Sequence, residues 1–340
     1  MNIYFIIIIS IIIFEYLLSN IIRKLNIDAL SPNLPNEKGF DLFHGWLEDM
    51  MEDYVVKRRV GKNFMRLNDK EIDPQGHATD IFSDWAVDYI KSRKNKDNPF
   101  FLYLAYNAPH SPVQPPKEYY QKVIKRNPKL LKKRAKLIAF IEHLDYGIGK
   151  VVRSLKKIGE YENTLIIFTS DNGGDLQSLA NNGKLRDGKQ SMYEGGLRVP
   201  TVIVWPNAIK KGSSSNQINS TVDIYPTLMS IVGLKLNDSF DGQSFLSTLI
   251  GNELNIEREI YFVRREGNIN YGGKAYHAIR VGDWKLLQNS PYKPLELYNL
   301  KNDPFEKNNL VDQFPEKVLE LNNKLMIHIQ EGGETPWQKK

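Results

Sequence analysis

The chain has 340 residues, of which 41% are hydrophobic and 25% are charged, which excludes a disordered, collagen-like or small disulfide-stapled protein. The length suits one large α/β domain, or a main domain with a smaller one attached. The formal net charge of +6 mildly favours anionic partners. The chain contains no cysteine, which excludes disulfides, thiolate metal sites and a cysteine nucleophile.

The chain begins with a hydrophobic N-terminal segment, residues 1–24, with an almost unbroken apolar run at 3–14. Basic residues follow this run instead of preceding it, and no small-residue cleavage site appears, which is atypical of a secretory signal. The roughly 20 residues of a membrane helix are reached only by including polar residues such as Glu15. Two interpretations stay open: an export or membrane segment that contacts a membrane through residues 1–22, and a stretch with no role of its own.

Three short runs that are apolar throughout predict buried parallel strands, because strands covered on both faces show no alternation. They are residues 100–106, 164–169 and 201–205. Between the first two lies a long helical stretch, roughly 118–158. A strand, a helix and a second strand are typical of a βαβ unit, so we expect a layered α/β domain.

A basic run within the helical stretch, residues 122–136, holds eight Lys or Arg residues and no acid. A solvated helix face explains such a run, and a landing surface for a polyanionic substrate is the alternative. No nucleic-acid-binding motif accompanies the charge, so we expect no nucleic-acid partner.

The pattern changes near residue 256, where short strands replace the α/β alternation. The predicted elements are a hairpin at 275–281 and 284–288, a strand at 295–300 and an amphipathic helix at 315–330. We therefore expect an α/β core over 32–255 and a C-terminal subdomain over 256–340, with a small antiparallel sheet and one helix.

A histidine follows the first predicted strand, where open α/β sheets bind their ligands. His110 lies between Pro109 and Pro112, which we expect to hold the loop extended and fix the direction of the imidazole. A lone histidine is more often structural, so His110 is a candidate on position alone.

Two oxygen-bearing side chains follow the second predicted strand. Asp171 offers a carboxylate and Asn172 an amide oxygen, and such donors suit a hard cation such as Ca²⁺ or Mg²⁺. Asp-Asn-Gly is also a strong turn former, and a plain turn is the alternative.

A glycine-rich segment, residues 187–200, carries the third candidate. Lys189 stands among small and polar neighbours and can neutralise an anionic oxygen as a compact charge. A solvated loop lysine is the alternative. We expect Glu194 and Arg198 to pair and hold the loop.

Taken together, these segments resemble the sulfatase family of the alkaline phosphatase superfamily. The matching segments are PFFLYLAYNAPHSP at 99–112, TLIIFTSDNGG at 164–174, GKQSMYEGGLRVP at 188–200, and, in the family's order, the shorter matches at 39–45, 142–149, 223–227, 278–285 and 297–304. The resemblance covers roughly residues 32–331. It implies an alkaline-phosphatase-like sandwich with a central, mostly parallel sheet.

The resemblance implies a sulfuric ester hydrolase. In this family a hydrated formylglycine, made from Cys or Ser inside a C/S-x-P/A-x-R motif, attacks sulfur, while Ca²⁺, Lys and His stabilise the sulfate oxygens. By motif, Asp171 and Asn172 resemble two ligands of the Ca²⁺ ion, and His110 and Lys189 resemble the residues that bind sulfate and favour ester cleavage. The implied partner is a sulfated small molecule or polysaccharide, and the implied location is periplasmic or extracellular.

The other histidines receive no catalytic role from the resemblance. His143 and Asp145 fall in a helix match that we interpret as structural. No role follows for His44, His77, His277 and His328.

The sequence departs from the family at its front. No cysteine exists, and no serine has both the Pro or Ala and the Arg that the formylglycine motif requires. The family's paired N-terminal aspartates have no counterpart before Pro32, so only a weak Ca²⁺ site is expected. We therefore expect a sulfatase lacking its N-terminal portion and the first strand of its sheet, without activity as it stands. The alternatives are a non-catalytic anion- or glycan-binding remnant and a phosphatase or phosphonate hydrolase of the same superfamily.

Overall fold

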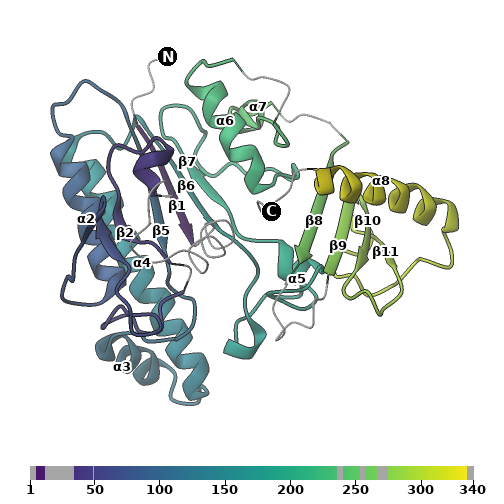
Figure 1. Cartoon of the computed structure of the whole chain (residues 1–340), viewed down its shortest axis with the longest axis horizontal. Coiled ribbons are helices and arrows are strands. Elements are labelled where there is room, and N and C mark those ends of the chain that lie inside the picture. Colours follow the sequence, from purple (N-terminus) through teal and green to yellow (C-terminus); the bar gives the residue numbers. More distant parts are fainter. Residues whose placement is uncertain are drawn as a thin grey trace. The chain divides into compact units, whose positions relative to one another are not determined.

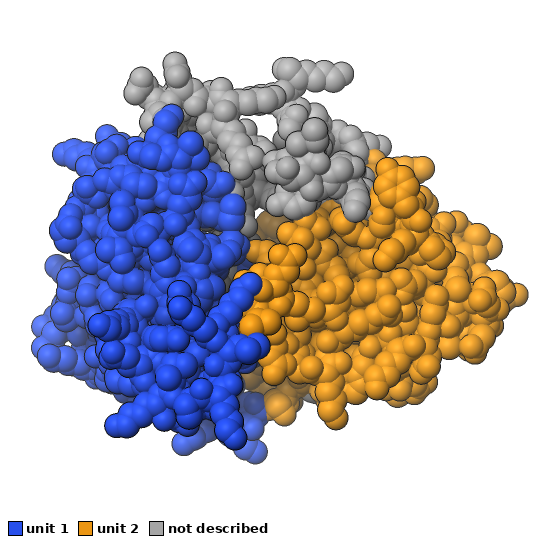
Figure 2. Space-filling model, turned by 90° about the horizontal axis from the view of Figure 1, so that it is seen from below, with its two compact units in different colours: residues 1–171, 200–213 blue, residues 172–199, 214–340 orange. Residues whose placement is uncertain are grey.

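The computed structural model describes residues 5–11, 34–48, 50–235, 240–252, 257–265 and 275–334 (Figure 1). The chain divides into two compact units, coloured separately in Figure 2. The first unit comprises Met1–Asp171 and Pro200–Ser213, and the second comprises Asn172–Val199 and Ser214–Lys340.

A four-stranded sheet of order β5-β1-β6-β7 forms the centre of the first unit. Its strands are β1 (Phe5–Ile11), β5 (Phe100–Tyr106), β6 (Thr164–Ser170) and β7 (Val202–Val204). β1 pairs in parallel with both β5 and β6, whereas β7 is antiparallel to β6. The predicted mostly parallel sheet is confirmed, but the parallel direction predicted for residues 201–205 is wrong.

The hydrophobic N-terminal run supplies the strand β1, which lies between β5 and β6. The expectation that this sheet lacks its first strand is therefore wrong. The strand has seven residues, which is within the usual length of a strand, and its sequence FIIIISI is apolar except for Ser10. Residues 1–4 and 12–24 of the predicted segment lie outside the described ranges. Within those ranges, no helix combines the length and apolar character needed to cross a bilayer.

Helices α2 (Ala78–Ser92) and α4 (Lys132–Ile158) lie side by side against the sheet in Figure 1. Their buried apolar side chains share one core with those of β5 and β6, including Ile90, Phe140 and Leu104. The helical stretch predicted over 118–158 is two helices, because α3 (Lys117–Arg126) ends before Pro128 and α4 begins after it. Gly159 closes α4 in the left-handed conformation.

A small antiparallel sheet completes the first unit. It contains β2 (His44–Trp46), β3 (Met65–Leu67) and β4 (Lys70–Glu71), preceded by the 3₁₀ turn η1 (Pro35–Lys38).

The second unit ends in an antiparallel sheet of order β11-β10-β9-β8. Its strands are β8 (Glu259–Arg265), β9 (Ala275–Val281), β10 (Trp284–Gln288) and β11 (Glu296–Asn299). Helix α8 (Pro315–Glu334) packs Leu321 and Leu325 on Ile279 and Leu286. The predicted hairpin, third strand and closing helix are therefore confirmed, and β8 is an additional strand.

The remaining elements of the second unit are short. They are η2 (Leu176–Ser178), α5 (Glu194–Leu197), η3 (Thr221–Asp223), α6 (Ile224–Ile231) and α7 (Leu246–Leu249). Buried Asp223 joins this region to the start of β8 through two hydrogen bonds from the Arg258 guanidinium.

Candidate functional site

Two predicted site residues, His110 and Asp171, belong to the first unit and follow parallel strands. The sheet register aligns Tyr106 of β5 and Ser170 of β6 with Ile11 of β1. The carboxyl ends of these strands therefore lie at one edge of the sheet, as βαβ topology requires. His110 and Asp171 follow from this edge on either side of β1.

The loop after β5 turns sharply instead of running extended as predicted. The N–H of His110 donates to the Asn107 carbonyl at 2.9 Å, which closes a turn. The hydroxyl of the buried Tyr54 donates to the carbonyl of His110 at 3.1 Å. The imidazole Nδ1 lies 2.8 Å from the carbonyl of Ser111, so Nδ1 carries the proton that this bond needs. These contacts fix both the loop and the ring.

The boundary between the two units falls between Asp171 and Asn172. The hydroxyl of Ser170 donates to a carboxylate oxygen of Asp171 at 3.2 Å. The amide of Asn172 donates to the carbonyl of Gly173 at 3.0 Å. Oδ1 is the atom of the Asn172 side chain whose chemistry suits a cation.

In the second unit, the turn after Asn172 is joined to the loop of Lys189. The backbone N–H of Lys189 donates to the carbonyl of Gly174 at 3.1 Å. The side chain of Asn182 bonds both backbone groups of Gly174 and also the carbonyl of Asp187. Two motifs that the sequence separates by 15 residues are therefore one hydrogen-bonded structure.

Close backbone approach explains the glycines of this structure. A Cβ at position 173 would lie 1.7 Å from the carbonyl oxygen of Gly195, and one at Gly188 would lie 2.3 Å from that of Gly174. Any larger residue at these positions forces the two segments apart.

The predicted pairing of Glu194 with Arg198 is not the contact that forms. Glu194 instead accepts a bond of 2.8 Å from the buried ammonium of Lys285, which also bonds Glu306 at 2.8 Å. Glu306 in turn accepts the backbone N–H of Glu194 at 2.7 Å. Glu194 therefore holds the start of α5 against the C-terminal sheet, a structural role as predicted but with other partners.

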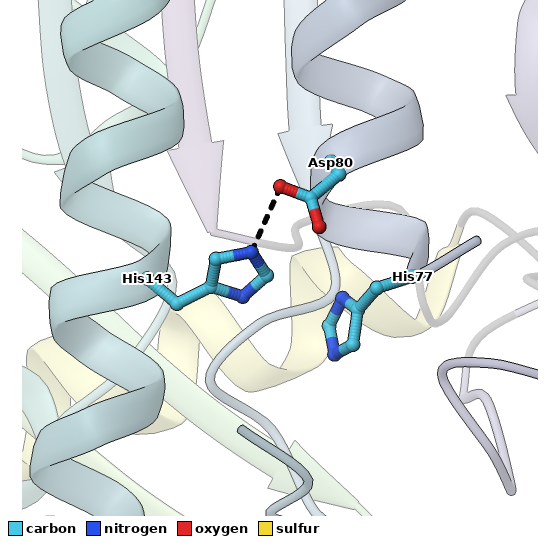
Figure 3. A group of neighbouring side chains, drawn as sticks. All are labelled: His77, Asp80 and His143. Carbon is cyan, nitrogen blue, oxygen red and sulfur yellow. Dashed lines mark hydrogen bonds and ion pairs between the residues drawn. The ribbon is translucent and has the colours of Figure 1, made fainter. Parts of the chain in front are cut away.

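A cluster that the sequence did not reveal lies in the first unit: His77, Asp80 and His143 (Figure 3). His77 caps the N-terminus of α2, its Nδ1 accepting the N–H of Thr79 at 3.2 Å. His143, on α4, contacts the Asp80 carboxylate through Nε2 at 2.9 Å. Sequence spacing gave no signal, because Asp80 on α2 and His143 on α4 are 63 residues apart in the chain.

Burial and hydrogen bonding shift the acid–base equilibria of this cluster. Burial lowers the pKa of His77, which favours its neutral form. The hydrogen bond from His143 lowers the pKa of Asp80, which stays ionised at neutral pH.

Within the described residues, no group of three or more histidine or carboxylate ligand atoms includes Asp171. Calcium takes about 6–8 oxygen ligands, and several of them are carboxylates in strong sites. The central strand β1 ends at Ile11, and residues 12–14 are Ile, Ile and Phe, which carry no side-chain oxygen. Asp171 and Asn172 are thus the ligand-type residues that the sulfatase motifs supply here, and we derive no chemical step through a metal.

Comparison with known families identifies two matches. The sulfatase family model matches residues 20–234. The model described as N-sulphoglucosamine sulphohydrolase, C-terminal, matches residues 186–332. The ordered motifs at 99–112, 164–174 and 188–200 all lie inside the first match.

Individual sulfatases are also similar to this chain. A sulfatase of Formosa agariphila is 34% identical over 73% of this chain and 49% of its own length. The mouse N-acetylgalactosamine-6-sulfatase is 27% identical over 75% of this chain and 43% of its own length. The crystal structure of Ps i-CgsB in complex with k-i-k-neocarrahexaose has a TM-score of 0.79 and 30% identity, covering 95% of this chain and 70% of that one. The chain spans about half the length of the curated relatives it matches. The chain belongs to the sulfatase family.

Proposed function

We propose that this chain serves the hydrolysis of sulfate esters of carbohydrates, with His110, Lys189, Asp171 and Asn172 as its contribution to the active site. The observation that carries the proposal is the family match over residues 20–234, which contains all four residues in the order of the family's motifs. In this proposal the chain itself binds the sulfate ester. Turnover requires in addition a segment with the formylglycine motif C/S-x-P/A-x-R, which does not occur in residues 1–340.

Each side chain has a chemical task that its type supports. The Lys189 ammonium is a compact positive charge that offsets a sulfate oxygen. His110, with its ring oriented by the Ser111 carbonyl, favours departure of the alcohol oxygen by hydrogen bonding or proton donation. Asp171 and Asn172 carry the oxygen donors that would hold a Ca²⁺ ion, and so few ligands would hold it weakly.

Sulfated glycans are the substrate class we favour. Among the relatives, one is named for the 6-sulfate of N-acetylgalactosamine and another was solved with an oligosaccharide. The basic face that runs from α3 into α4, residues 122–136, offers a polyanionic chain additional attraction. Such substrates fit a periplasmic or extracellular location, which fractionation of cells expressing the native gene tests directly.

Binding and turnover are measured on the same purified chain. Calorimetry with a sulfated disaccharide is expected to give millimolar or tighter binding, and Lys189→Ala and His110→Ala each weaken it by at least about tenfold, a loss of about 1.4 kcal/mol. Lys184→Ala is the matched control, because this lysine lies in the same loop over the ring of Phe305 and has no predicted sulfate contact. If Lys189→Ala, His110→Ala and the control bind the disaccharide equally well, the assignment of Lys189 and His110 to the sulfate site is wrong.

Turnover separates the remaining alternatives. We expect no release of sulfate from an aryl sulfate, because loss of a nucleophile commonly removes several orders of magnitude in rate. Sulfate release by the chain alone would overturn the requirement for an added segment. Fusion to the formylglycine-bearing front of a related sulfatase is expected to restore release. If the fusion instead hydrolyses an aryl phosphate and leaves the aryl sulfate intact, the chain is a phosphatase of the same superfamily.

A further inference from the structure

The cluster of His77, Asp80 and His143 lies in the first unit, and of the three only His143 belongs to a segment that resembles the sulfatases, residues 142–149. We propose that these three side chains bind a divalent transition-metal ion of the zinc class. Two imidazoles and one carboxylate form a donor set that favours zinc, copper or nickel over calcium and magnesium, which prefer oxygen ligands alone. The site therefore differs in chemistry from the oxygen donors of Asp171 and Asn172.

The ligand atoms are already close to the spacing that a bound ion requires. One ring nitrogen of each histidine and one carboxylate oxygen lie within 4.8 Å of one another. Nε2 of His143 is 2.9 Å from Oδ1 of Asp80. Tetrahedral zinc, with bonds of about 2.0–2.1 Å, separates its ligands by about 3.3 Å. An ion can therefore replace the proton between Nε2 and Oδ1 with small movements of the side chains.

The second nitrogen of His143 can take the proton that the ion displaces from Nε2. His143 is 1% exposed, and its Nδ1 is a buried atom with no hydrogen-bond partner among the described residues. When Nε2 binds the ion, the proton of the neutral ring moves to Nδ1 and breaks no bond there. A buried imidazole nitrogen without a hydrogen-bond partner is uncommon in proteins, and here it lies beside a second histidine and a carboxylate.

The third ligand, His77, is held in place by its neighbours. Its Nδ1 accepts the Thr79 N–H, and its Nε2 contacts the Gln114 carbonyl at 3.0 Å. Metal binding displaces one of these two bonds, and the other still orients the ring, as outer contacts do in metal sites. The rings of His77 and His143 lie with their centroids 4.7 Å apart, and Figure 3 shows both beside the Asp80 carboxylate.

An ion can reach this cluster from solvent. The Asp80 side chain is 43% exposed, and Asp80 and His143 line an open groove of about 680 Å³. The carboxylates of Glu118, Glu142 and Asp145 also line this groove, against the cations Lys122 and Arg153. Counting Asp80, acids outnumber bases at its walls, which favours entry of a cation. Three protein ligands leave a fourth position for water.

The test uses the full chain expressed without a polyhistidine tag. Zinc is titrated in competition with a chromophoric chelator, and cobalt(II) serves as a spectroscopic probe of coordination. We expect one equivalent of zinc and a tetrahedral cobalt spectrum. Asp80→Asn, which preserves shape, and His143→Gln are each expected to weaken zinc binding about 10- to 100-fold. Zinc is expected to raise the melting temperature of the parent protein and of neither variant.

The control variant is His328→Gln, which removes a histidine stacked on Tyr261 in the second unit. It is expected to keep the one-equivalent site. Three results would overturn the proposal: no binding at micromolar zinc, equal affinity in Asp80→Asn and the parent chain, or loss of the site in the His328 control. Because Asp80 is partly exposed and the control lies in the other unit, a folding defect is distinguishable from a lost ligand.

Discussion

Replacing Lys285 by methionine probes the buried charge network that holds Glu194. Lys285 and Glu306 are fully buried, and the ammonium lies 2.8 Å from a carboxylate oxygen of each glutamate. At this separation each pair attracts by about 6 kcal/mol for an effective dielectric constant of about 20, most of which offsets desolvation. Removing the cation leaves the buried Glu306 without its ammonium partner and Glu194 with the more distant Arg280 guanidinium at 3.8 Å, so we expect a loss of about 3–5 kcal/mol in the free energy of unfolding.

The loss should depend on pH in a direction that the structure fixes. Burial raises the pKa of Glu306 above its usual value, so the folded protein binds a proton that the unfolded chain releases. Stability contributed by that proton is present at low pH and is lost as pH rises through the unfolded and then the folded pKa. Without Lys285 the folded pKa rises further. The destabilisation by Lys285→Met is therefore expected to be smaller near about pH 5 than near about pH 8.

Urea unfolding followed by circular dichroism measures both effects. Lys317→Met is the control, because Lys317 forms a solvent-accessible pair with Glu320 on α8, and such pairs contribute at most about 1 kcal/mol. The double variant Lys285→Met, Glu306→Gln should recover part of the loss, because it removes one stranded charge and keeps an acceptor for the Glu194 N–H. A loss under about 1 kcal/mol, or one that does not change with pH, would refute the reasoning.

Three further predictions concern packing and ionisation. Gly173→Ala should prevent normal folding, because its Cβ would lie 1.7 Å from a backbone oxygen. The control is Gly332→Ala in α8, where nothing lies within 4 Å of the added Cβ, and it should stabilise the protein by up to about 1 kcal/mol in thermal melts. Leu325→Ala truncates a side chain of α8 that is 1% exposed, and it should lower the free energy of unfolding in urea by about 2–5 kcal/mol. A loss below about 1 kcal/mol would contradict that packing. Burial raises the pKa of Tyr106 to about 12, so its phenolate should appear in absorbance titrations only well above the usual value of about 10. Since unfolded tyrosine ionises first, stability should fall as pH rises above about 10, and Tyr106→Phe should reduce that fall.

The sequence was sufficient for the elements whose pattern is local. Residues 100–106 and the hairpin around Gly282 follow from apolar runs and turn residues, and the structure confirms them. The predicted direction of β7 was wrong, because the sequence of a short apolar strand carries no information on whether it runs parallel to its neighbour. The division of the long helix was missed although Pro128 was visible, because the basic pattern continues on both sides of it.

The candidate site residues divide in the same way. The positions of His110 and Asp171 after strands could be predicted from the sequence. The link between the turn at Gly174 and the loop of Lys189 could not, because it consists of backbone bonds and an Asn182 side chain. The partners of Glu194 were wrong for a similar reason. A salt bridge four residues apart is visible in a sequence, but a buried pair 91 residues apart requires the fold.

The position of β1 has a practical consequence for anyone who prepares this protein. Its residues look like a dispensable leader, and a clone that omits the first eleven residues would remove the strand between β5 and β6. Both neighbours would then present unpaired backbone groups along seven residues, a ready template for strands from other molecules. A shortened clone is therefore expected to aggregate in size-exclusion chromatography. A synthetic peptide with the sequence FIIIISI has little to set its register, since a shift by one residue leaves a nearly identical strand, so it should rescue such a clone poorly.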